Sequence, residues 1–206
     1  MVTGANGFIG KNLLQHLAER TDLEVVTFTR DNNPSNLKFL LDGIDFIFHL
    51  AGVNRPQDEN DFAKSNNDLT QYLCDAINDT GRSIPIVFTS SIQAPQNNPY
   101  GNSKLAAENV LFSAHRASGL PVHVFRLPNV FGKWCMPNYN SVVATFCYNI
   151  ARGLPIQINN PSAILELVYV DDLIDRFIQL MDGADTMIDP GGFEIILPQY
   201  TTTVGD

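Results

Sequence analysis

The sequence predicts an α/β fold, a doubly wound parallel sheet with helices on both faces. One observation is the glycine-rich start of the chain. There, Gly4, Gly7 and Gly10 separate a short apolar stretch from apolar residues at helical spacing, namely Ile9, Leu13, Leu14 and Leu17. The other is the alternation of short apolar runs with helical patterns along the rest of the chain. Strands that alternate with helices build a parallel sheet, and a strand, glycine turn and helix in this order bring backbone N–H groups close to a phosphate.

The composition suits one sizeable globular domain and argues against several kinds of partner. Of the 206 residues, 44% are hydrophobic and 17% are charged. The net charge of −9 argues against nucleic acid or an anionic membrane as the main partner. No apolar run approaches the roughly 20 residues of a membrane span, and no secretory signal opens the chain. Cys74, Cys135 and Cys147 lack metal spacing, so we expect no metal site, and buried free thiols in a reducing cytoplasm.

The glycine turn predicts a site for a pyrophosphate. Gly4 permits the tight turn, Gly7 lets the main chain approach the ligand, and Gly10 lets the helix pack on the sheet. Only Met1 and Val2 precede this turn, whereas a strand usually has about five residues. We therefore expect the chain to begin inside its first strand.

The second strand indicates which dinucleotide is bound. Residues 24–29 read as this strand, and Thr29 is followed by Arg30. About 20 residues after the glycine turn, an NAD-binding protein places an acidic residue for the ribose 2′-hydroxyl. Because the acid is missing and an arginine can pair with a 2′-phosphate, the sequence favours NADP(H) over NAD(H). The alternative is that Arg30 is a solvated charge at a strand end.

The next part of the chain predicts the middle of the sheet. His49 stands within an apolar run, and we expect it to be a structural histidine rather than a catalyst. Asn54 and Arg55 follow that run, at the edge of the sheet where ligands bind. The expected elements are a brief helix within 31–43, buried strands at 45–52 and 83–89, and a helix at 61–77.

Residues that could form a catalytic site follow the strand expected at 83–89. Ser91 comes just after it, and a helical pattern runs from residue 101 to about residue 117. Tyr100 stands just before this pattern and Lys104 stands within it. Being four apart, they share a helix face, one turn from each other. A cation at that distance is expected to lower the phenol pKa from its usual value near 10, which would make Tyr100 an acid or base near neutral pH. Ser91 can hydrogen-bond the reacting oxygen.

The last third of the chain predicts a region for a second ligand. In the loop 131–140, Trp134 and Tyr139 can stack on a base or a sugar, and the asparagine amides can bond hydroxyls. A packed loop held by asparagine turns is the alternative. We also expect a strand at 121–127 followed by a turn at Pro128-Asn129, a helix at 142–150, a short strand at 153–158, and a helix at 173–181 capped by Asp171 and Asp172.

Several of these motifs together resemble the extended short-chain dehydrogenases/reductases, over nearly the whole chain. They are Thr3-Gly4-x-x-Gly7-x-x-Gly10, the segment 49–52, Ser91, Tyr100-x-x-x-Lys104, and the segments 126–132 and 169–172. The segments 50–56, 90–94 and 132–141 are similar to the capsule-synthesis reductase of the CapF type. Two features depart from the wider pattern. Leu165 and Glu166 stand where many relatives have an arginine, and the short connection 31–43 omits a strand usual in extended reductases.

The resemblance implies a Rossmann fold with a small C-terminal substrate-binding subdomain, in one domain over 1–206. Residues 1–130 would mainly bind the dinucleotide, and 131–160 and 182–206 mainly the substrate. It further implies a chain truncated at both ends, a cupin domain after it in the full-length protein, and a cytoplasmic location. A homodimer is one possibility.

The residues and the resemblance together assign roles in the site. Ser91, Tyr100 and Lys104 form the expected catalytic set. The expected cofactor-binding residues are Gly4, Asn6, Gly7, Phe8, Ile9, Gly10, Arg30, Leu50, Ala51, Gly52, Tyr100, Lys104 and Pro128. The expected substrate-binding residues are Asn54, Arg55, Ser91, Gln93, Asn129, Lys133, Asn138 and Asn140.

The implied function is NADPH-dependent reduction of the C4 ketone of a UDP-linked 4-keto-6-deoxy N-acetylhexosamine. This step lies on the route to UDP-N-acetyl-L-fucosamine in surface polysaccharide synthesis. The second candidate function is that of a nucleotide-sugar epimerase or dehydratase. However, Ile92 and Gln93 offer a dehydratase no proton shuttle, and Arg30 does not suit the NAD that an epimerase usually keeps. The third candidate is a non-catalytic module that binds NADP.

Overall fold

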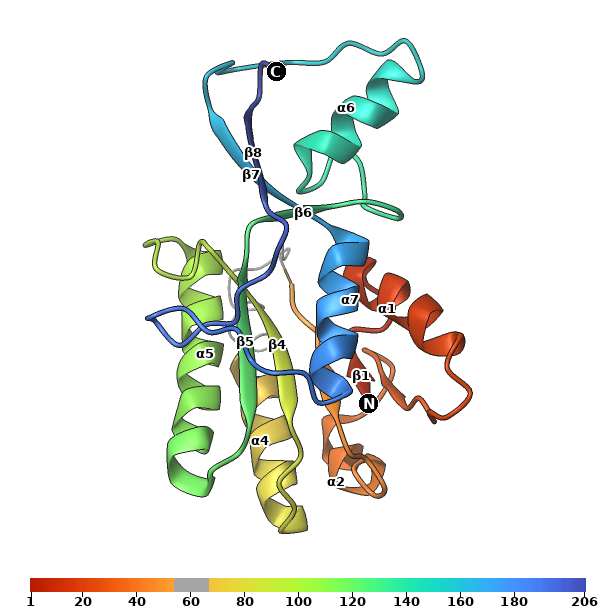
Figure 1. Cartoon of the computed structure of the whole chain (residues 1–206), viewed down its shortest axis with the longest axis vertical. Coiled ribbons are helices and arrows are strands. Elements are labelled where there is room, and N and C mark those ends of the chain that lie inside the picture. The colour runs from red at the N-terminus through yellow and green to blue at the C-terminus, as the bar shows by residue number, and fades with distance from the viewer. Residues whose placement is uncertain (54–66) are drawn as a thin grey trace.

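The central sheet is parallel and doubly wound, as the sequence predicts. In the computed structural model, which describes residues 1–53 and 67–206, its strands follow the order β2-β1-β3-β4-β5 (Figure 1). The chain passes from β1 to β2 on one side and then to β3 on the other, which leaves a crevice at the carboxyl ends of β1 and β3. The strand bounds are β1 (Val2–Thr3), β2 (Thr27–Phe28), β3 (Ile47–His49), β4 (Ile86–Ser91) and β5 (Val122–Leu127).

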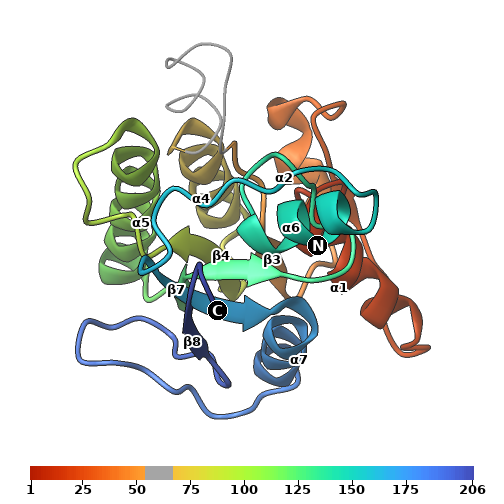
Figure 2. The same ribbon diagram turned by 90° about the horizontal axis from the view of Figure 1, so that it is seen from above.

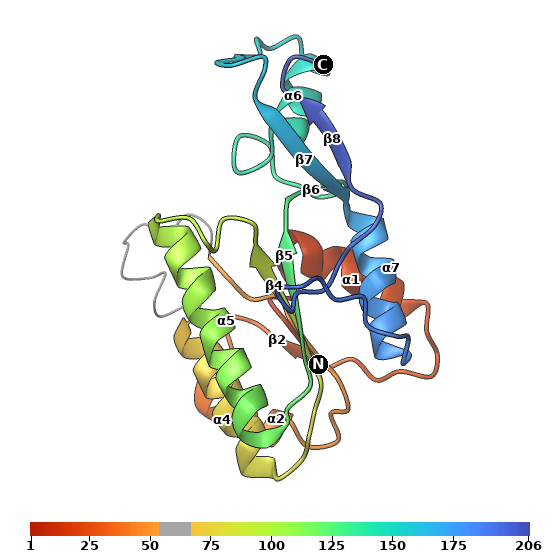
Figure 3. The same ribbon diagram turned by 60° about the vertical axis from the view of Figure 1, so that its left-hand side comes forward.

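Helices cover both faces of this sheet (Figures 1 and 3). On one face lie α1 (Phe8–Ala18) and α7 (Val170–Met181), and on the other α2 (Leu37–Leu40), α4 (Leu69–Thr80) and α5 (Pro99–Ser118). Successive strand residues point to opposite faces. Phe48, Val87 and Phe125 therefore pack with α1 and α7, whereas Ile47, Ile86, Phe88 and Val124 pack in the other core.

The helix α5 begins two residues before the expected position, and its sequence explains why. The Asn98 side chain caps it by accepting a hydrogen bond from the backbone N–H of Gly101 over 2.7 Å. Pro99 occupies the first helical position, where a missing N–H has no consequence. At the other end, Gly119 has a φ of 72° and terminates the helix.

A smaller unit lies beyond the carboxyl edge of the central sheet. Its strand β6 (Asn129–Phe131) pairs in parallel with β7 (Ile164–Tyr169), which pairs antiparallel with β8 (Tyr200–Thr203). The helix α6 (Val142–Ile150) belongs to the same unit, and the view from above shows it over the ends of the central strands (Figure 2). The expected small C-terminal subdomain is therefore present as a structural unit.

Several expected elements differ in the structure. The second strand covers only Thr27–Phe28 of the expected 24–29, and the expected strand at 153–158 is wrong, because these residues form no ladder. Asp171 and Asp172 do not cap α7. They lie inside its first turn, and the N-cap is Tyr169, without a side-chain hydrogen bond. Their charge still complements the positive end of the helix dipole.

Other expectations hold or hold in part. The connection 31–43 contains the 3-10 turn η1 (Pro34–Asn36) and α2 but no strand, so β2 is an edge of the sheet. The helix α4 runs to Thr80, beyond the expected end at 77, and the first part of that prediction falls on residues 54–66, outside the described residues. All three cysteines are free, but only Cys74 is buried. Within the described residues, no helix is both long and apolar enough to cross a bilayer.

Candidate functional site

A cavity of about 1260 Å³ opens at the carboxyl edge of the central sheet. Its walls come from the glycine turn, the ends of β3, β4 and β5, the first turns of α5, and residues of the segment from Trp134 to Phe146. It therefore lies between the sheet and the smaller unit, where doubly wound sheets bind ligands. Single small-molecule sites usually enclose roughly 300–1,000 Å³, so this cavity has room for two ligands side by side.

Each of the three positions in the turn requires glycine for a different structural reason. Gly4 has a φ of +69°, and a Cβ there would lie 2.6 Å from the backbone nitrogen of Ala51. A Cβ at Gly10 would collide with the carbonyl oxygen of Gly4, so Gly10 lets α1 approach the turn. At Gly7 a Cβ would meet only that same oxygen, at 3.1 Å, and its other side faces the cavity. Protein packing requires Gly4 and Gly10, whereas Gly7 leaves room for a ligand.

The amino end of α1 also fits an anionic ligand. Its N-cap is Gly7, which has extended backbone angles, and within the described residues no side chain caps this end. Its first turn contains no acidic residue. First-turn N–H groups point out along the helix axis and carry a partial positive charge. The turn and the helix together therefore form a cradle that suits a pyrophosphate.

The structure joins Tyr100 and Ser91, which come from different elements. Tyr100 stands in the first turn of α5 and Ser91 ends β4, and their side chains are hydrogen-bonded. The backbone N–H of Gln93 donates to the Ser91 oxygen over 3.1 Å, which fixes the orientation of this side chain. Both side chains line the cavity. The phenol and the alcohol therefore meet at one point in its wall.

Lys104 is held by the strand that carries Ser91. Its side chain is 4% exposed, and its ammonium donates a hydrogen bond to the carbonyl oxygen of Thr89 over 2.8 Å. The ammonium also lies 5.1 Å from the centre of the Phe88 ring. Burial lowers the pKa of Lys104 to about 8, although the negative charge of Glu108 acts in the opposite direction.

The expectation that Lys104 lowers the phenol pKa is wrong. The pKa of Tyr100 is raised instead, mainly because burial disfavours the phenolate. The hydrogen bond from Ser91 acts against this effect, and the neighbouring Tyr139 adds to it. Spacing on a helix shows that two side chains share a face, but it does not show that the cation points at the phenol. Tyr100 therefore holds its proton at neutral pH.

Most residues expected to bind a cofactor surround one end of the cavity. Arg30 also lines it, from an exposed position just after β2. Ala51 is the exception, since it is not part of the lining, although its N–H donates to the Thr3 hydroxyl over 3.1 Å. The lining residues from this set are Gly4, Asn6, Gly7, Phe8, Ile9, Gly10, Arg30, Leu50, Gly52, Tyr100, Lys104 and Pro128.

The residues expected to bind a substrate divide into three groups. Ser91, Gln93, Asn129, Asn138 and Asn140 line the cavity. Asn54 and Arg55 lie outside the described residues. Lys133 does not line the cavity, and its ammonium lies 4.2 Å from the centre of the Trp134 ring. This side chain, expected to bind the substrate, thus lies against a neighbouring aromatic ring.

The loop from Gly132 to Ser141 has an unusual backbone. Trp134 and Asn138 adopt positive φ angles of 67° and 56°, which non-glycine residues rarely do. The loop is tied to the glycine-turn helix by Asn12, which is 3% exposed and donates to the carbonyl oxygens of Phe8 and Lys133, each over 2.9 Å. Sequence reasoning missed Asn12, and the only available signal was a polar residue on the apolar side of an amphipathic helix.

Other cavity residues also escaped sequence reasoning. Thr89 and Ser90 stand at the end of β4, where the neighbouring Ser91 was the only residue singled out. The structure adds a set from the smaller unit whose position no spacing rule gives: Cys135, Met136, Ser141, Val142, Thr145, Phe146 and Gln157.

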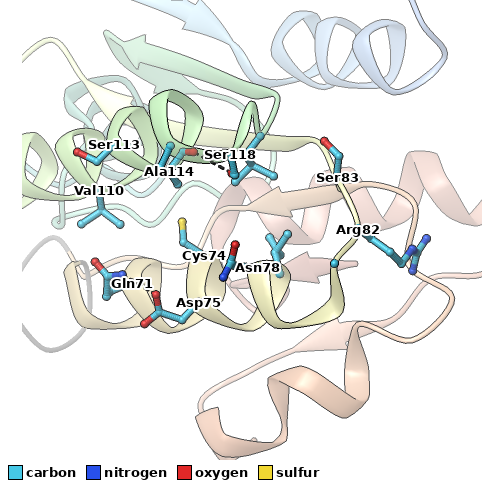
Figure 4. A pocket seen from close by; sticks show the side chains of 14 residues that line it. Gln71, Cys74, Asp75, Asn78, Arg82, Ser83, Val110, Ser113, Ala114 and Ser118 are labelled. Atoms are coloured by element: carbon cyan, nitrogen blue, oxygen red, sulfur yellow. Dashed lines mark hydrogen bonds between the residues drawn. The ribbon is translucent and has the colours of Figure 1, made fainter.

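A second cavity of about 470 Å³ lies away from this site, between α4 and α5. Figure 4 shows Gln71, Cys74 and Asn78 on one helix opposite Ser113 and Ala114 on the other. Burial raises the pKa of the Cys74 thiol to about 12, so this cysteine is not a nucleophile at neutral pH. Within the described residues, no group of three or more His, Cys, Asp and Glu side chains is placed to hold a metal ion.

Comparisons with known proteins identify the group to which the chain belongs. The model of the NAD dependent epimerase/dehydratase family matches residues 1–195. A Pseudomonas aeruginosa protein named UDP-2-acetamido-2,6-beta-L-arabino-hexul-4-ose reductase is 53% identical over the whole chain, which spans 55% of that protein. An Arabidopsis thaliana protein named UDP-glucuronic acid decarboxylase 3 is 26% identical, over 95% of this chain and 71% of that protein.

Solved structures agree with this grouping. The Staphylococcus aureus capsular polysaccharide assembling protein CapF has a TM-score of 0.86 and 41% identity, over 99% of this chain and 55% of that protein. A UDP-glucuronic acid 4-epimerase from Bacillus cereus, solved with NAD, has a TM-score of 0.79 at 20% identity, over 97% of this chain and 79% of that one. This likeness shows the fold alone. The chain spans about half the length of the Pseudomonas and Staphylococcus proteins, and it belongs to the NAD dependent epimerase/dehydratase family.

Proposed function

We propose that this chain is the reductase part of an enzyme that reduces the C4 ketone of a UDP-linked 4-keto-6-deoxy N-acetylhexosamine with NADPH. The observation that carries the proposal is the hydrogen-bonded pair Ser91 and Tyr100, with Lys104 beside it, in a cavity that also contains the glycine turn. The 53% identity to a protein named as a reductase of a 4-keto UDP-sugar supports the substrate class. Surface polysaccharide synthesis is the setting that the likeness to the capsular protein supports.

The residues present fit a bound dinucleotide. The room left at Gly7 and the uncapped end of α1 would hold the pyrophosphate. Arg30, at the rim of the cavity, would pair with a 2′-phosphate, which supports NADPH over NADH. Lys104 would bond the nicotinamide ribose. When bound, the dinucleotide supplies the hydride for the sugar carbon.

The protein's own part in the reaction is proton transfer and orientation. The Ser91 hydroxyl bonds the oxygen of the C4 ketone and holds it beside the phenol. When that oxygen becomes an alkoxide, the Tyr100 hydroxyl gives it a proton and leaves a phenolate. The raised pKa of Tyr100 keeps the phenol protonated before the reaction. An alkoxide is a far stronger base than a phenolate, so the transfer is favourable. The nearby Lys104 ammonium then stabilises the phenolate.

We further propose that different parts of the chain bind the two ligands. Residues 1–130 mainly bind the dinucleotide, and 131–160 and 182–206 mainly bind the sugar nucleotide. The lining of the cavity supports the first two ranges, because the glycine turn forms one side of it and residues 134–157 contribute the other. The resemblance to the CapF type also supports a cupin domain in the full-length protein, and a homodimer remains a proposal.

The second candidate is an epimerase on the same scaffold, and solved epimerases share this fold. A test of the two uses the full-length protein with a UDP-4-keto-6-deoxy N-acetylhexosamine and NADPH. A reductase consumes one NADPH for each sugar reduced, as measured by loss of NADPH absorbance and by the mass of the product. The proposal fails if NADPH is not consumed, or if the sugar is inverted at C4 with no net oxidation of the cofactor.

A further inference from the structure

We propose that Glu108 is a positioning residue of this site. Its buried carboxylate ties the helix that carries Tyr100 and Lys104 to the end of the strand that carries Ser91, and it keeps a negative charge beside the Lys104 ammonium. The inference rests on the proposed function for its catalytic consequence, but its electrostatic part can be tested without turnover.

Glu108 stands at the centre of a hydrogen-bonded group built from three elements. It lies on α5, one turn after Lys104, and is 1% exposed. The Ser90 hydroxyl donates to one of its oxygens. The Arg126 guanidinium donates to both oxygens, from Nε over 3.0 Å and from Nη2 over 2.7 Å. A carboxylate that accepts three hydrogen bonds from two strands fixes the distance between them and its own helix.

One donor, Ser90, lines the cavity, and the other, Arg126, stands next to a residue that lines it. Ser90 directly precedes Ser91 in β4, and Arg126 directly precedes Leu127 in β5. The two donors are also opposite each other in the β4–β5 ladder. Adjacent strand residues point to opposite faces, so the Ser91 hydroxyl bonds Tyr100 whereas the Ser90 hydroxyl bonds Glu108. A shift of this carboxylate would therefore move the strand end that presents Ser91 to Tyr100.

Arg126 is itself held from the other side. Its guanidinium lies 3.8 Å from the centre of the Phe193 ring. The segment that contains Phe193 runs along β5, where the N–H of Glu194 donates to the carbonyl oxygen of Val124 over 2.8 Å. Arg126 therefore cannot swing away readily when its partner changes, and the bidentate pair is a fixed part of the site.

The negative charge of Glu108 is important because the other groups around Lys104 are neutral or already paired. Tyr100 is neutral on the same helix, and His49 from β3 is neutral because burial lowers its pKa to about 3. Arg126 from β5 is already paired with Glu108. The strand β4 offers only the carbonyl oxygen of Thr89 and the Phe88 ring. Among the described residues, Glu108 is the carboxylate whose negative charge raises the pKa of Lys104.

This arrangement has a chemical consequence. Burial already lowers the pKa of Lys104 to about 8, so the ammonium is close to losing its proton in the physiological range. A neutral amine would give the Tyr100 phenolate no electrostatic support. Glu108 therefore extends the pH range in which Lys104 is charged. If Glu108 only held the helix and the strands together, its loss would affect folding and geometry to the same extent at every pH.

The test compares Glu108→Gln and Glu108→Asp in the full-length protein with Ser90→Ala. Glu108→Gln removes the charge and keeps the size of the side chain, Glu108→Asp keeps the charge, and Ser90→Ala removes one bond of the tie. We expect the alkaline limb of the kcat–pH profile to move about one unit lower in Glu108→Gln. Since the Lys104 pKa is about 8, kcat should then fall about fivefold at pH 8 and very little at pH 6. Glu108→Asp and Ser90→Ala should keep the position of that limb.

A second measurement works even if the proposed substrate is wrong. Lysine labelled with ¹⁵N and ¹³C reports the titration of Lys104 by NMR, with Lys104→Met as the assignment control. We expect Lys104 to titrate at lower pH in Glu108→Gln than in the wild-type protein. An unchanged titration in a folded Glu108→Gln overturns the inference. Absence of wild-type turnover would overturn the proposed reaction instead, and the NMR result would still decide the role of Glu108.

Discussion

The ammonium of Lys104 donates its hydrogen bond to the carbonyl oxygen of Thr89, over 2.8 Å, and so is tied to the strand beneath it. The phenol of Tyr100 is instead bonded to Ser91, at the end of the same strand. The two side chains that share a helix face thus bond different residues of β4. Burial dominates the ionisation of both groups, because it raises the pKa of the phenol and lowers that of the amine.

We predict that Tyr100→Phe lowers kcat by roughly 10²–10⁴-fold, the usual contribution of a positioned acid. NADPH affinity should change little, because the glycine turn and Arg30 hold the dinucleotide. Stopped-flow measurement of NADPH oxidation and titration of NADPH binding check the two parts. Tyr139→Phe is the matched control, since Tyr139 is another phenol in the cavity wall. If Tyr139→Phe lost the activity and Tyr100→Phe kept it, the acid would be misassigned.

Local sequence patterns predicted the fold because the fold depends on them. The glycine turn, the apolar runs and the helical spacing of Leu13 and Leu17 fix which faces are buried. The same reasoning located most of the cavity, since ligands bind where parallel strands end. The brief connection 31–43 also has no strand in the structure.

The predictions from the sequence that proved wrong have one physical cause in common. The apolar alternation at 153–158 predicted a strand, but no neighbouring strand pairs with these residues. The direction of the Tyr100 pKa depends on burial and on where the Lys104 ammonium points, and spacing gives neither. Lys133 was expected at the ligand because of its charge, yet its ammonium lies over Trp134. The carboxylate of Glu108 reads in the sequence as an ordinary helix residue. Tertiary contacts decide each of these outcomes.

We predict that Arg30→Ala weakens NADPH binding about tenfold or more and leaves NADH binding nearly unchanged, because only NADPH carries the 2′-phosphate that an arginine can pair with. Isothermal titration of both cofactors with both proteins checks this. Lys38→Ala removes a cation from the exposed face of α2, outside the cavity lining, and serves as the control for net charge. An equal loss for the two cofactors would mean that Arg30 only supports the turn, and that the cofactor preference needs another explanation.

His49 is predicted to make the protein sensitive to acid. The side chain is fully buried, and its ring nitrogens bond the hydroxyls of Thr3 over 2.8 Å and Thr70 over 2.9 Å. Burial is the main reason that its pKa falls from 6.5 to about 3, and the charge of Lys104 lowers it further. Between these values the unfolded chain binds a proton that the folded chain does not. The free energy of unfolding should therefore decrease as the pH falls through this range, by at most about 1.4 kcal/mol per pH unit.

Urea unfolding between pH 7 and pH 4 measures this contribution. His49→Gln keeps a polar side chain that cannot take up the proton, so its stability should depend less steeply on pH than that of the wild-type protein. Gln15→Ala, which exchanges one neutral side chain for another on the exposed face of α1, should keep the wild-type slope. Equal slopes for the wild-type protein and His49→Gln would show that the acid sensitivity comes from other groups.

Asn12 is predicted to link the dinucleotide side of the cavity to the sugar side. Its amide donates to Phe8 in the first turn of α1 and to Lys133 in the loop that presents Trp134 to the cavity. Asn12→Ala leaves the Lys133 carbonyl without this donor, at a typical loss of about 1–3 kcal/mol. Because this loop is proposed to bind the sugar nucleotide, the KM for the sugar should rise about tenfold, whereas NADPH affinity should change little. Gln15→Ala, on the exposed face of α1, is the control. A rise in the NADPH dissociation constant without a change in the sugar KM would instead place the effect of Asn12 in the glycine turn.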